Sequence, residues 1–321
     1  MLRLYDVSSG QVEGIRPAHP GELRVLAVTA EVPDEPDAGQ LRAWLLPDLI
    51  RRCAERRRLV PTVCEITAAM TPGSAGDPGT ATVPDHAAAR TALNIHPPAR
   101  IAPASEPAER TAEFVAPGWG GGPAAGAPPF DVGTGDPGWF TGRAFARHLA
   151  APAGPVAGGG VTGSEVTGGG VTGGAVTGSG VTGGAVTGGG SAPLILADLA
   201  AQELDPLALR LVFLGERYRD GLTLTWDALH AAGKTLQRWR ESVAEWALSP
   251  SAPMSPRYAE AVTAAFEDDL DTPAALRQLD ALEADEDVPA GAKFETFAAL
   301  DRLLGLDLAR DIGKVSAPRA R

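Results

Sequence analysis

Residues 205–246 read DPLALRLVFLGERYRDGLTLTWDALHAAGKTLQRWRESVAEW, and this stretch determines the class of fold. In its second half, apolar residues recur at spacings of three, four and multiples of these, so they share one face of a helix. The members of this apolar stripe are Trp226, Leu229, Leu236, Trp239, Val243 and Trp246. Because three tryptophans on one stripe need partner helices to bury them, the stretch predicts a helical bundle.

Helix start signals and further periodicity extend this bundle. Thr225, or alternatively Thr223, is placed to cap the helix, and Asp205 with Pro206 is placed to begin a preceding helix over residues 207–218. The apolar pattern predicts the other helices near residues 194–202, 256–266, 273–284 and 292–305.

The amino-terminal half has a different pattern. Residues 1–6 alternate in polarity and predict a strand, while residues 23–28 and 59–66 are near-continuous apolar runs typical of buried parallel strands. A helix is predicted over residues 41–57, where Pro47 indicates a kink or a late start. Strand, helix and strand in this order are the opening of a Rossmann-like sheet.

A low-complexity segment separates the two halves. Residues 158–190 repeat Val-Thr-Gly with a period of five. Isolated valines bury too little area to offset the entropy of ordering, so we expect a disordered Gly-rich linker, with a short β-solenoid as the alternative. The predicted class is therefore α/β plus all-α, and its parts are a Rossmann-like domain over 1–150, a linker over 151–192, a helical bundle over 193–310 and a tail over 311–321.

The charge balance limits the class of partner. The chain has 321 residues and a net charge of −12. Residues 1–190 contain 14 basic and 18 acidic residues, and residues 191–321 contain 14 and 22. This balance argues against tight nucleic-acid binding, although a local basic face is not excluded.

Cysteine use and hydropathy indicate the compartment. Cys53 and Cys64 form no CxxC pattern, so we predict buried structural thiols, with a disulfide or metal role as the alternative. Because no signal-like or membrane-spanning run is visible, we expect a cytoplasmic protein without a membrane partner.

Several segments together resemble one protein family. They are residues 1–22 (MLRLYDVSSGQVEGIRPAHPGE), 93–107 (LNIHPPARIAPASEP), 205–210 (DPLALR), 217–219 (RYR), 266–273 (FEDDLDTP) and 303–306 (LLGL). These segments resemble cysteinyl-tRNA synthetases, which are class I enzymes, and the related mycothiol cysteine ligases. The resemblance implies a Rossmann-like class I synthetase domain, here eroded, followed by the family's helical bundle. It also implies a reaction in which ATP activates cysteine before transfer to tRNA or an amino sugar.

The resemblance places the family's ATP motif, HIGH, on residues 37–40, which read Asp-Ala-Gly-Gln. The motif's histidines stabilise charge on the phosphates. Gly39 and the arginine two places after the motif, Arg42, are retained, and Gln40 could still donate a hydrogen bond. Asp37 would place a negative charge beside a polyanion, so we interpret it as a solvated loop residue or a helix cap. We predict Gly39, Gln40 and Arg42 as remnant ATP-binding residues and assign no catalytic residue.

The family's second ATP signature, the lysine-rich KMSKS loop, should lie near residues 186–190. The first lysine of the chain is Lys234, and no arginine lies between Arg147 and Arg210. The cationic function of this loop therefore has no supplier in sequence order.

The family's zinc site also lacks its ligands. Zinc there would need two cysteines, a histidine and a glutamate. The first family cysteine falls on Val28, and the residual His96, His148 and Glu165 do not have ligand spacing. We therefore expect no zinc site and no other metal site.

Two charged runs have ordinary explanations. The acidic residues 267–271 are interpreted as a solvated helix end and the cap of the next helix, with a metal site as the alternative. Residues 56–58 (RRR) are interpreted as an exposed helix end, where cations suit the helix dipole, with phosphate contact as the alternative.

These losses lead to one preferred function and two alternatives. We favour a catalytically inactive paralogue of cysteinyl-tRNA synthetases that acts in binding or regulation, with tRNA or a protein as partner of the bundle. The alternatives are an active cysteine ligase with non-standard ATP-site residues and a structural bundle for protein interaction. The oligomeric state is not predicted.

Overall fold

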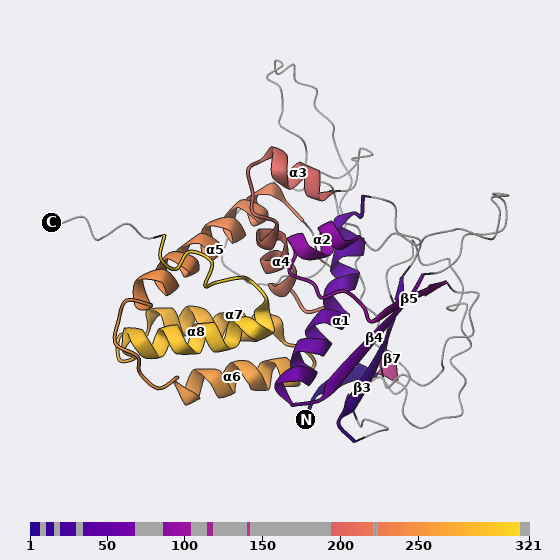
Figure 1. The fold of residues 1–321 in the computed structure, drawn as a ribbon, viewed down its shortest axis with the longest axis horizontal. Coiled ribbons are helices and arrows are strands. Elements are labelled where there is room, and N and C mark those ends of the chain that lie inside the picture. The colour runs from indigo at the N-terminus through magenta and orange to yellow at the C-terminus, as the bar shows by residue number, and fades with distance from the viewer. Residues whose placement is uncertain are drawn as a thin grey trace, which may run out of the picture.

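The computed structural model describes residues 1–6, 11–15, 20–29, 35–67, 86–103, 114–117, 140–141, 194–220, 222 and 224–314. In the amino-terminal part of the described chain strands alternate with helices, and from residue 196 onward the named elements are helices, which confirms the mixed class, α/β plus helical. Figure 1 shows the parallel strands on one side and the helices from α5 (Trp226–Trp246) to α8 (Ala290–Leu304) on the other. Between them lie α1 (Ala38–Arg56) and α4 (Pro206–Leu214).

The parallel sheet is built from short strands in the order β5-β4-β3-β6-β7. Their bounds are Glu22–Thr29 (β3), Val60–Thr67 (β4), Arg100–Pro103 (β5), Phe114–Pro117 (β6) and Phe140–Thr141 (β7). In the central pair, Val25 of β3 lies opposite Val63 of β4. A separate antiparallel pair joins β1 (Arg3–Asp6) to β2 (Gln11–Gly14). The strands predicted at 1–6, 23–28 and 59–66 are thus confirmed.

The helix α1 (Ala38–Arg56) connects β3 to β4, and Pro47 lies inside it. The helix begins before the predicted residue 41, so the interpretation of Pro47 as a late start is wrong. Most of α1 is buried, because it packs against the strands and also contacts α8. The short helix α2 (Ala87–Ala92) precedes β5.

The bundle contains α3 (Leu196–Ala201), α4 (Pro206–Leu214), α5 (Trp226–Trp246), α6 (Pro256–Glu267), α7 (Thr272–Ala284) and α8 (Ala290–Leu304). The capping predictions are confirmed: Thr225 Oγ1 accepts a hydrogen bond from Ala228 N at 3.1 Å, and Asp205 Oδ1 accepts one from Leu207 N at 2.9 Å. The ring centroids of Trp239 and Trp246 lie 6.2 and 5.2 Å from that of Phe297 in α8.

One helix is shorter than the sequence predicts. The helix expected over residues 207–218 ends at Leu214. The residues that follow are held in a turn, because Arg217 pairs with Asp271, and Tyr218 and Arg219 bind Asp269. These tertiary contacts outweigh the helical propensity of the segment.

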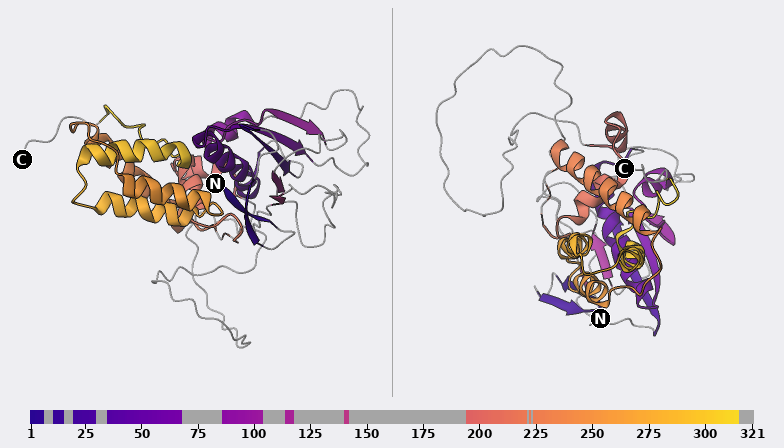
Figure 2. Two further views of the ribbon diagram at one scale, coloured as in Figure 1. Left: turned by 90° about the horizontal axis from the view of Figure 1, so that it is seen from below. Right: turned by 90° about the vertical axis from the view of Figure 1, so that its left-hand side faces the viewer.

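One buried apolar cluster extends through both parts of the described chain, from Leu23 and Trp44 to Phe266 and Phe297. Figure 2 shows from two further sides that the sheet and the helices lie against each other. No described helix combines the length and hydropathy needed to cross a membrane. The predicted linker over 151–192 lies outside the described residues, and the eroded Rossmann-like domain and the domain boundaries stay predictions.

The predictions for the two cysteines and for the two charged runs have different outcomes. Neither Cys53 nor Cys64 is in a disulfide; Cys53 is buried, and burial raises the pKa of its thiol to about 12, whereas Cys64 is half-buried. Residues 56–58 are exposed at the end of α1, as predicted. Asp271 caps α7 by accepting a hydrogen bond from Ala274 N at 3.0 Å, as predicted. The interpretation of the whole acidic run as solvated is wrong, because Asp269 is 3% exposed.

Candidate functional site

The amino end of α1 lies where a ligand site would be expected in this fold. The helix follows β3, so its amino end lies near the carboxyl end of a parallel strand, where α/β proteins bind ligands. Free N–H groups at such a helix end favour phosphate. The predicted ATP-site positions Gly39 and Gln40 lie in this first turn.

Two side chains of this turn accept hydrogen bonds from the backbone of the same turn. Asp37 Oδ1 accepts a hydrogen bond from Gln40 N at 2.9 Å, and Gln40 Oε1 accepts one from Asp37 N at 2.8 Å. This reciprocal pair is a capping box, which satisfies two backbone donors at once. The interpretation of Asp37 as a helix cap is confirmed, and its carboxylate occupies the end of the helix dipole that a phosphate would use.

A second segment of the chain also covers this helix end. Ala38 N donates to Leu194 O at 2.8 Å, and Asp37 pairs with Ile195 in an antiparallel bridge. Gly39 is buried in the same turn. The amino end of α1 is therefore bonded by groups of the chain itself.

Arg42 lies one turn further along α1 and is 5% exposed. Its guanidinium donates to Asp220 O at 3.0 Å and to Arg217 O at 2.9 Å. Burial lowers the pKa of Arg42, and the nearby Glu216 and Asp220 act in the opposite direction. The side chain holds the turn between α4 and α5 against α1. Binding of ATP by Gly39, Gln40 and Arg42 stays a prediction that belongs to the alternative of an active ligase.

The same turn binds a buried carboxylate that the sequence did not identify as a site. Asp269 accepts hydrogen bonds from Tyr218 Oη at 2.6 Å, from Arg219 Nε at 2.8 Å and from Tyr5 N at 2.9 Å. Burial and the hydrogen bond to Asp269 raise the pKa of Tyr218 far above its ordinary value. Asp269 thus joins β1 to the bundle.

A second buried carboxylate lies in the middle of α1. Asp48 Oδ2 accepts from Arg52 Nε at 2.8 Å and from Arg210 Nη2 at 2.9 Å. Its Oδ1 contacts His96 Nδ1 at 2.6 Å and accepts from His96 N at 3.1 Å. Burial alone would raise the pKa of Asp48, but Arg210, His96 and Arg52 together hold it well below its ordinary value.

The remaining predicted positions do not assemble into a site. Val28 lies in β3, and His96 is occupied with Asp48. His148, Glu165 and residues 186–190 lie outside the described residues. Within the part of the chain that the structure describes, no group of three or more His, Cys, Asp or Glu is arranged to hold a metal ion.

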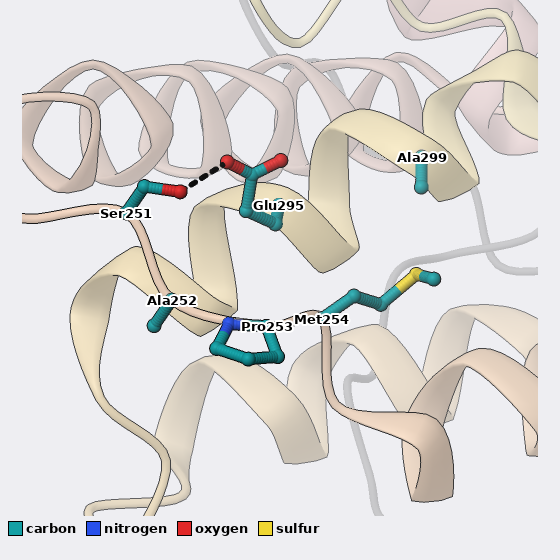
Figure 3. Close-up of a pocket in the computed structure, with 6 residues that line it drawn as sticks. All are labelled: Ser251, Ala252, Pro253, Met254, Glu295 and Ala299. Atoms are coloured by element: carbon teal, nitrogen blue, oxygen red, sulfur yellow. Dashed lines mark hydrogen bonds between the residues drawn. The ribbon is translucent and has the colours of Figure 1, made fainter.

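The surface also has an open hollow of about 510 Å³ at the other end of the bundle (Figure 3). Its wall is formed by Ser251, Ala252, Pro253, Met254, Glu295 and Ala299. Ser251 Oγ is hydrogen-bonded to Glu295 Oε1 at 3.1 Å. The hollow lies on the α5–α6 connection and α8, far from the amino end of α1 in Figure 1.

Comparison with known proteins finds relatives for part of the chain, while no family model matches it. An L-cysteine:1D-myo-inositol 2-amino-2-deoxy-alpha-D-glucopyranoside ligase of Nakamurella multipartita is 36% identical over 110 residues, which are 34% of this chain and 25% of that protein. The ligase of the same name from Gordonia bronchialis is 38% identical over 110 residues, or 33% of this chain and 26% of that protein.

A cysteine–tRNA ligase of Treponema denticola is 30% identical over 141 residues, or 36% of this chain and 28% of that protein. The chain thus spans about a quarter of the length of the curated relatives that it matches.

Proposed function

Since this chain is related to the cysteinyl-tRNA synthetase family, we propose that it is a catalytically inactive relative that acts by binding or regulation. In this proposal the chain does not activate cysteine with ATP. Its helical bundle serves as the surface for a partner.

The observation that carries the proposal is the self-bonded amino end of α1. At the positions of the two motif histidines stand Asp37 and Gln40, whose side-chain oxygens accept hydrogen bonds from each other's backbone N–H groups. A carboxylate at this point repels a polyphosphate and already occupies the positive end of the helix dipole. Arg42, the retained arginine, donates to two backbone carbonyls and is buried.

The distribution of cations supports the same proposal. No lysine precedes Lys234, so the lysines that bind the migrating phosphates in the family have no counterpart in sequence order. Enzymes of this kind accelerate their reaction mainly by stabilising charge on the transferred group. Loss of both sets of donors removes that stabilisation.

The charge of the bundle favours a protein over tRNA as the partner. Residues 191–321 contain 14 basic and 22 acidic residues. Nucleic-acid affinity depends on neutralising phosphates with lysine and arginine. An acidic bundle fits a protein partner better.

Calorimetric titration of the full chain with Mg-ATP, with and without L-cysteine, tests the proposal. The protein is first shown to melt cooperatively, and a cysteine–tRNA ligase titrated in parallel serves as the positive control. We expect no saturable heat and no cysteine-dependent exchange of pyrophosphate into ATP. Saturable binding together with exchange would overturn the proposal and favour an active ligase with a non-standard site. In that case Gln40→Ala would be expected to abolish binding.

A further inference from the structure

The carboxyl end of α8 is held by arginines from three other helices. The last four carbonyls of a helix have no donor within the helix, and this end of the dipole attracts cations. Arg52 of α1 donates to Arg302 O at 3.0 Å, and Arg210 of α4 donates to Leu304 O at 2.6 Å. Just beyond the helix, Arg240 of α5 donates to Leu306 O at 2.9 Å.

Arg210 is the centre of this arrangement, and its side chain has no exposed surface. Besides Leu304 O, it donates to Leu93 O at 2.9 Å, to Asn94 O at 3.2 Å and to Asp48 Oδ2 at 2.9 Å. One guanidinium therefore bonds α1, α8 and the segment after α2 while it extends from α4.

Gly305 makes room for the arginines. It ends α8 with φ +65°, a backbone conformation that glycine adopts without strain. A Cβ at this position would lie 2.8 Å from Arg210 Nη2 and 2.9 Å from Arg52 Cζ. Asn94 Nδ2 completes the junction by donating to Gly305 O at 3.0 Å.

We propose that this arginine-held end of α8 is a strap that makes α1 and the segment 93–96 open only together with the bundle. Separating the two parts would break the bonds from Arg210 to Asp48 and to the segment 93–96, and the bond from Arg52 to Arg302 O. Arg210 would then lose its carboxylate partner, which is costly for a buried charge. Through the strap, a partner that binds the bundle acts on α1, the helix whose amino end carries the ATP-motif positions. The coupling of α1 to the bundle stands on these contacts alone, whereas the action of a partner through it rests on the proposed function.

Hydrogen exchange of the full chain, resolved by peptide, tests the strap. In Arg210→Met we expect exchange in α1 and in residues 93–96 to accelerate at least about tenfold, because removing one partner of a buried pair destabilises what remains. Exchange in α6 and α7 should change much less. Gly305→Ala should accelerate exchange in the same segments, because its Cβ would displace Arg210 and Arg52 from the end of α8.

Two matched controls accompany these variants. Arg238→Met removes an exposed arginine of α5 that pairs with Asp280 and Glu283 of α7, and it should leave α1 unchanged. Gly313→Ala adds a Cβ at φ +79° where no atom lies within 4 Å, so it separates backbone strain from contact with the arginines.

The outcomes decide the proposal in either direction. If Arg210→Met does not fold, the exchange of α1 and residues 93–96 is measured in two other variants. They are Arg210→Lys, which keeps the charge with fewer donors, and Gly305→Ala. Acceleration confined to α4 and α8, or an equal acceleration of every helix, would overturn the strap. Acceleration in α1 and residues 93–96 that the two controls do not reproduce would establish it.

Discussion

Asp48 is a carboxylate in the interior, and its charge is compensated by residues far away in sequence. Its partner Arg210 is 162 positions away, and His96 is 48 positions away. Because these partners favour the charged form, the pKa of Asp48 is held low despite burial. Asp48 therefore contributes stability when it is charged in both the folded and the unfolded chain.

Removing the charge of Asp48 gives a prediction about acid stability. A lowered folded-state pKa stabilises the fold above the unfolded-state value of about 3.9, and this contribution is lost as pH falls below it. We expect Asp48→Asn to cost about 3–5 kcal/mol at neutral pH. Below about pH 4, the difference in unfolding free energy between the variant and the unaltered chain should shrink by up to about 1.4 kcal/mol per pH unit. Urea unfolding at a series of pH values measures both quantities.

The control for Asp48 is a carboxylate in an exposed pair. Asp280 pairs with Arg238 on the surface of the bundle, and Asp280→Asn should stay within about 0.5 kcal/mol of the unaltered chain at every pH. Burial raises the pKa of Asp301, so the effect of Asp301 on the pH dependence of stability has the opposite sign to that of Asp48. Both variants retain Asp301, so this effect cancels when each is compared with the unaltered chain. The prediction would be contradicted if the difference in unfolding free energy between Asp48→Asn and the unaltered chain stayed constant down to about pH 2. The carboxyl of Asp48 is protonated in the unfolded chain at that pH.

The buried partners are the part of the site that the sequence could not predict. Asp269 lies in an acidic run that is indistinguishable by composition from a solvated helix end. Its burial depends on Tyr5 N, 264 positions away, and on the turn that carries Tyr218 and Arg219. A single sequence contains no signal for such non-local contacts. Local chemistry was predictable: Asp37, Asp205 and Thr225 each cap the helix that follows them.

At the scale of the element, α1 depends on its capping box. We expect Asp37→Ala to cost about 1 kcal/mol of unfolding free energy, because it removes the acceptor for Gln40 N and the carboxylate at the helix end. Asp37→Asn keeps an acceptor and should cost less. Urea unfolding followed by the fluorescence of the chain's tryptophans measures the difference. Equal stability of the unaltered chain and Asp37→Ala would show that Ala38 N–H and its bond to Leu194 hold the end of α1 unaided.

Helices with a clear apolar period were predictable, and their ends were less so. The stripe of α5 locates that helix almost to the residue, because its apolar face must pack on α4 and α8. For α4, the periodic pattern continues past Leu214 while the chain turns to meet Asp269 and Asp271. For α1, Pro47 indicates a boundary by its local chemistry, yet packing on the sheet and α8 maintains the helix through it.

At the scale of the molecule, the two described parts share a core, and three of the polar junctions between them centre on buried side chains. These junctions centre on Asp48 with Arg210, on Arg42 with the turn after α4, and on Asp269 with β1. All three involve segments that resemble the cysteine-ligase family. These contacts position the bundle on the sheet of this chain.

The Val-Thr-Gly repeat gives the last prediction, because it distinguishes a linker from a structural element. If residues 158–190 are a linker, their deletion shortens a loop and changes the unfolding free energy by no more than about 1 kcal/mol, since closure entropy depends weakly on loop length. A variant with a Gly-Ser segment of equal length separates the effect of sequence from that of length. Should the repeat instead form a β-solenoid packed on the sheet, both variants would lose several kcal/mol, as expected when a packed element is removed. Denaturant unfolding of the unaltered chain, the deletion variant and the Gly-Ser variant decides between these cases. Equal unfolding free energies would mean that the core and the polar junctions described above, and not the repeat, stabilise the fold.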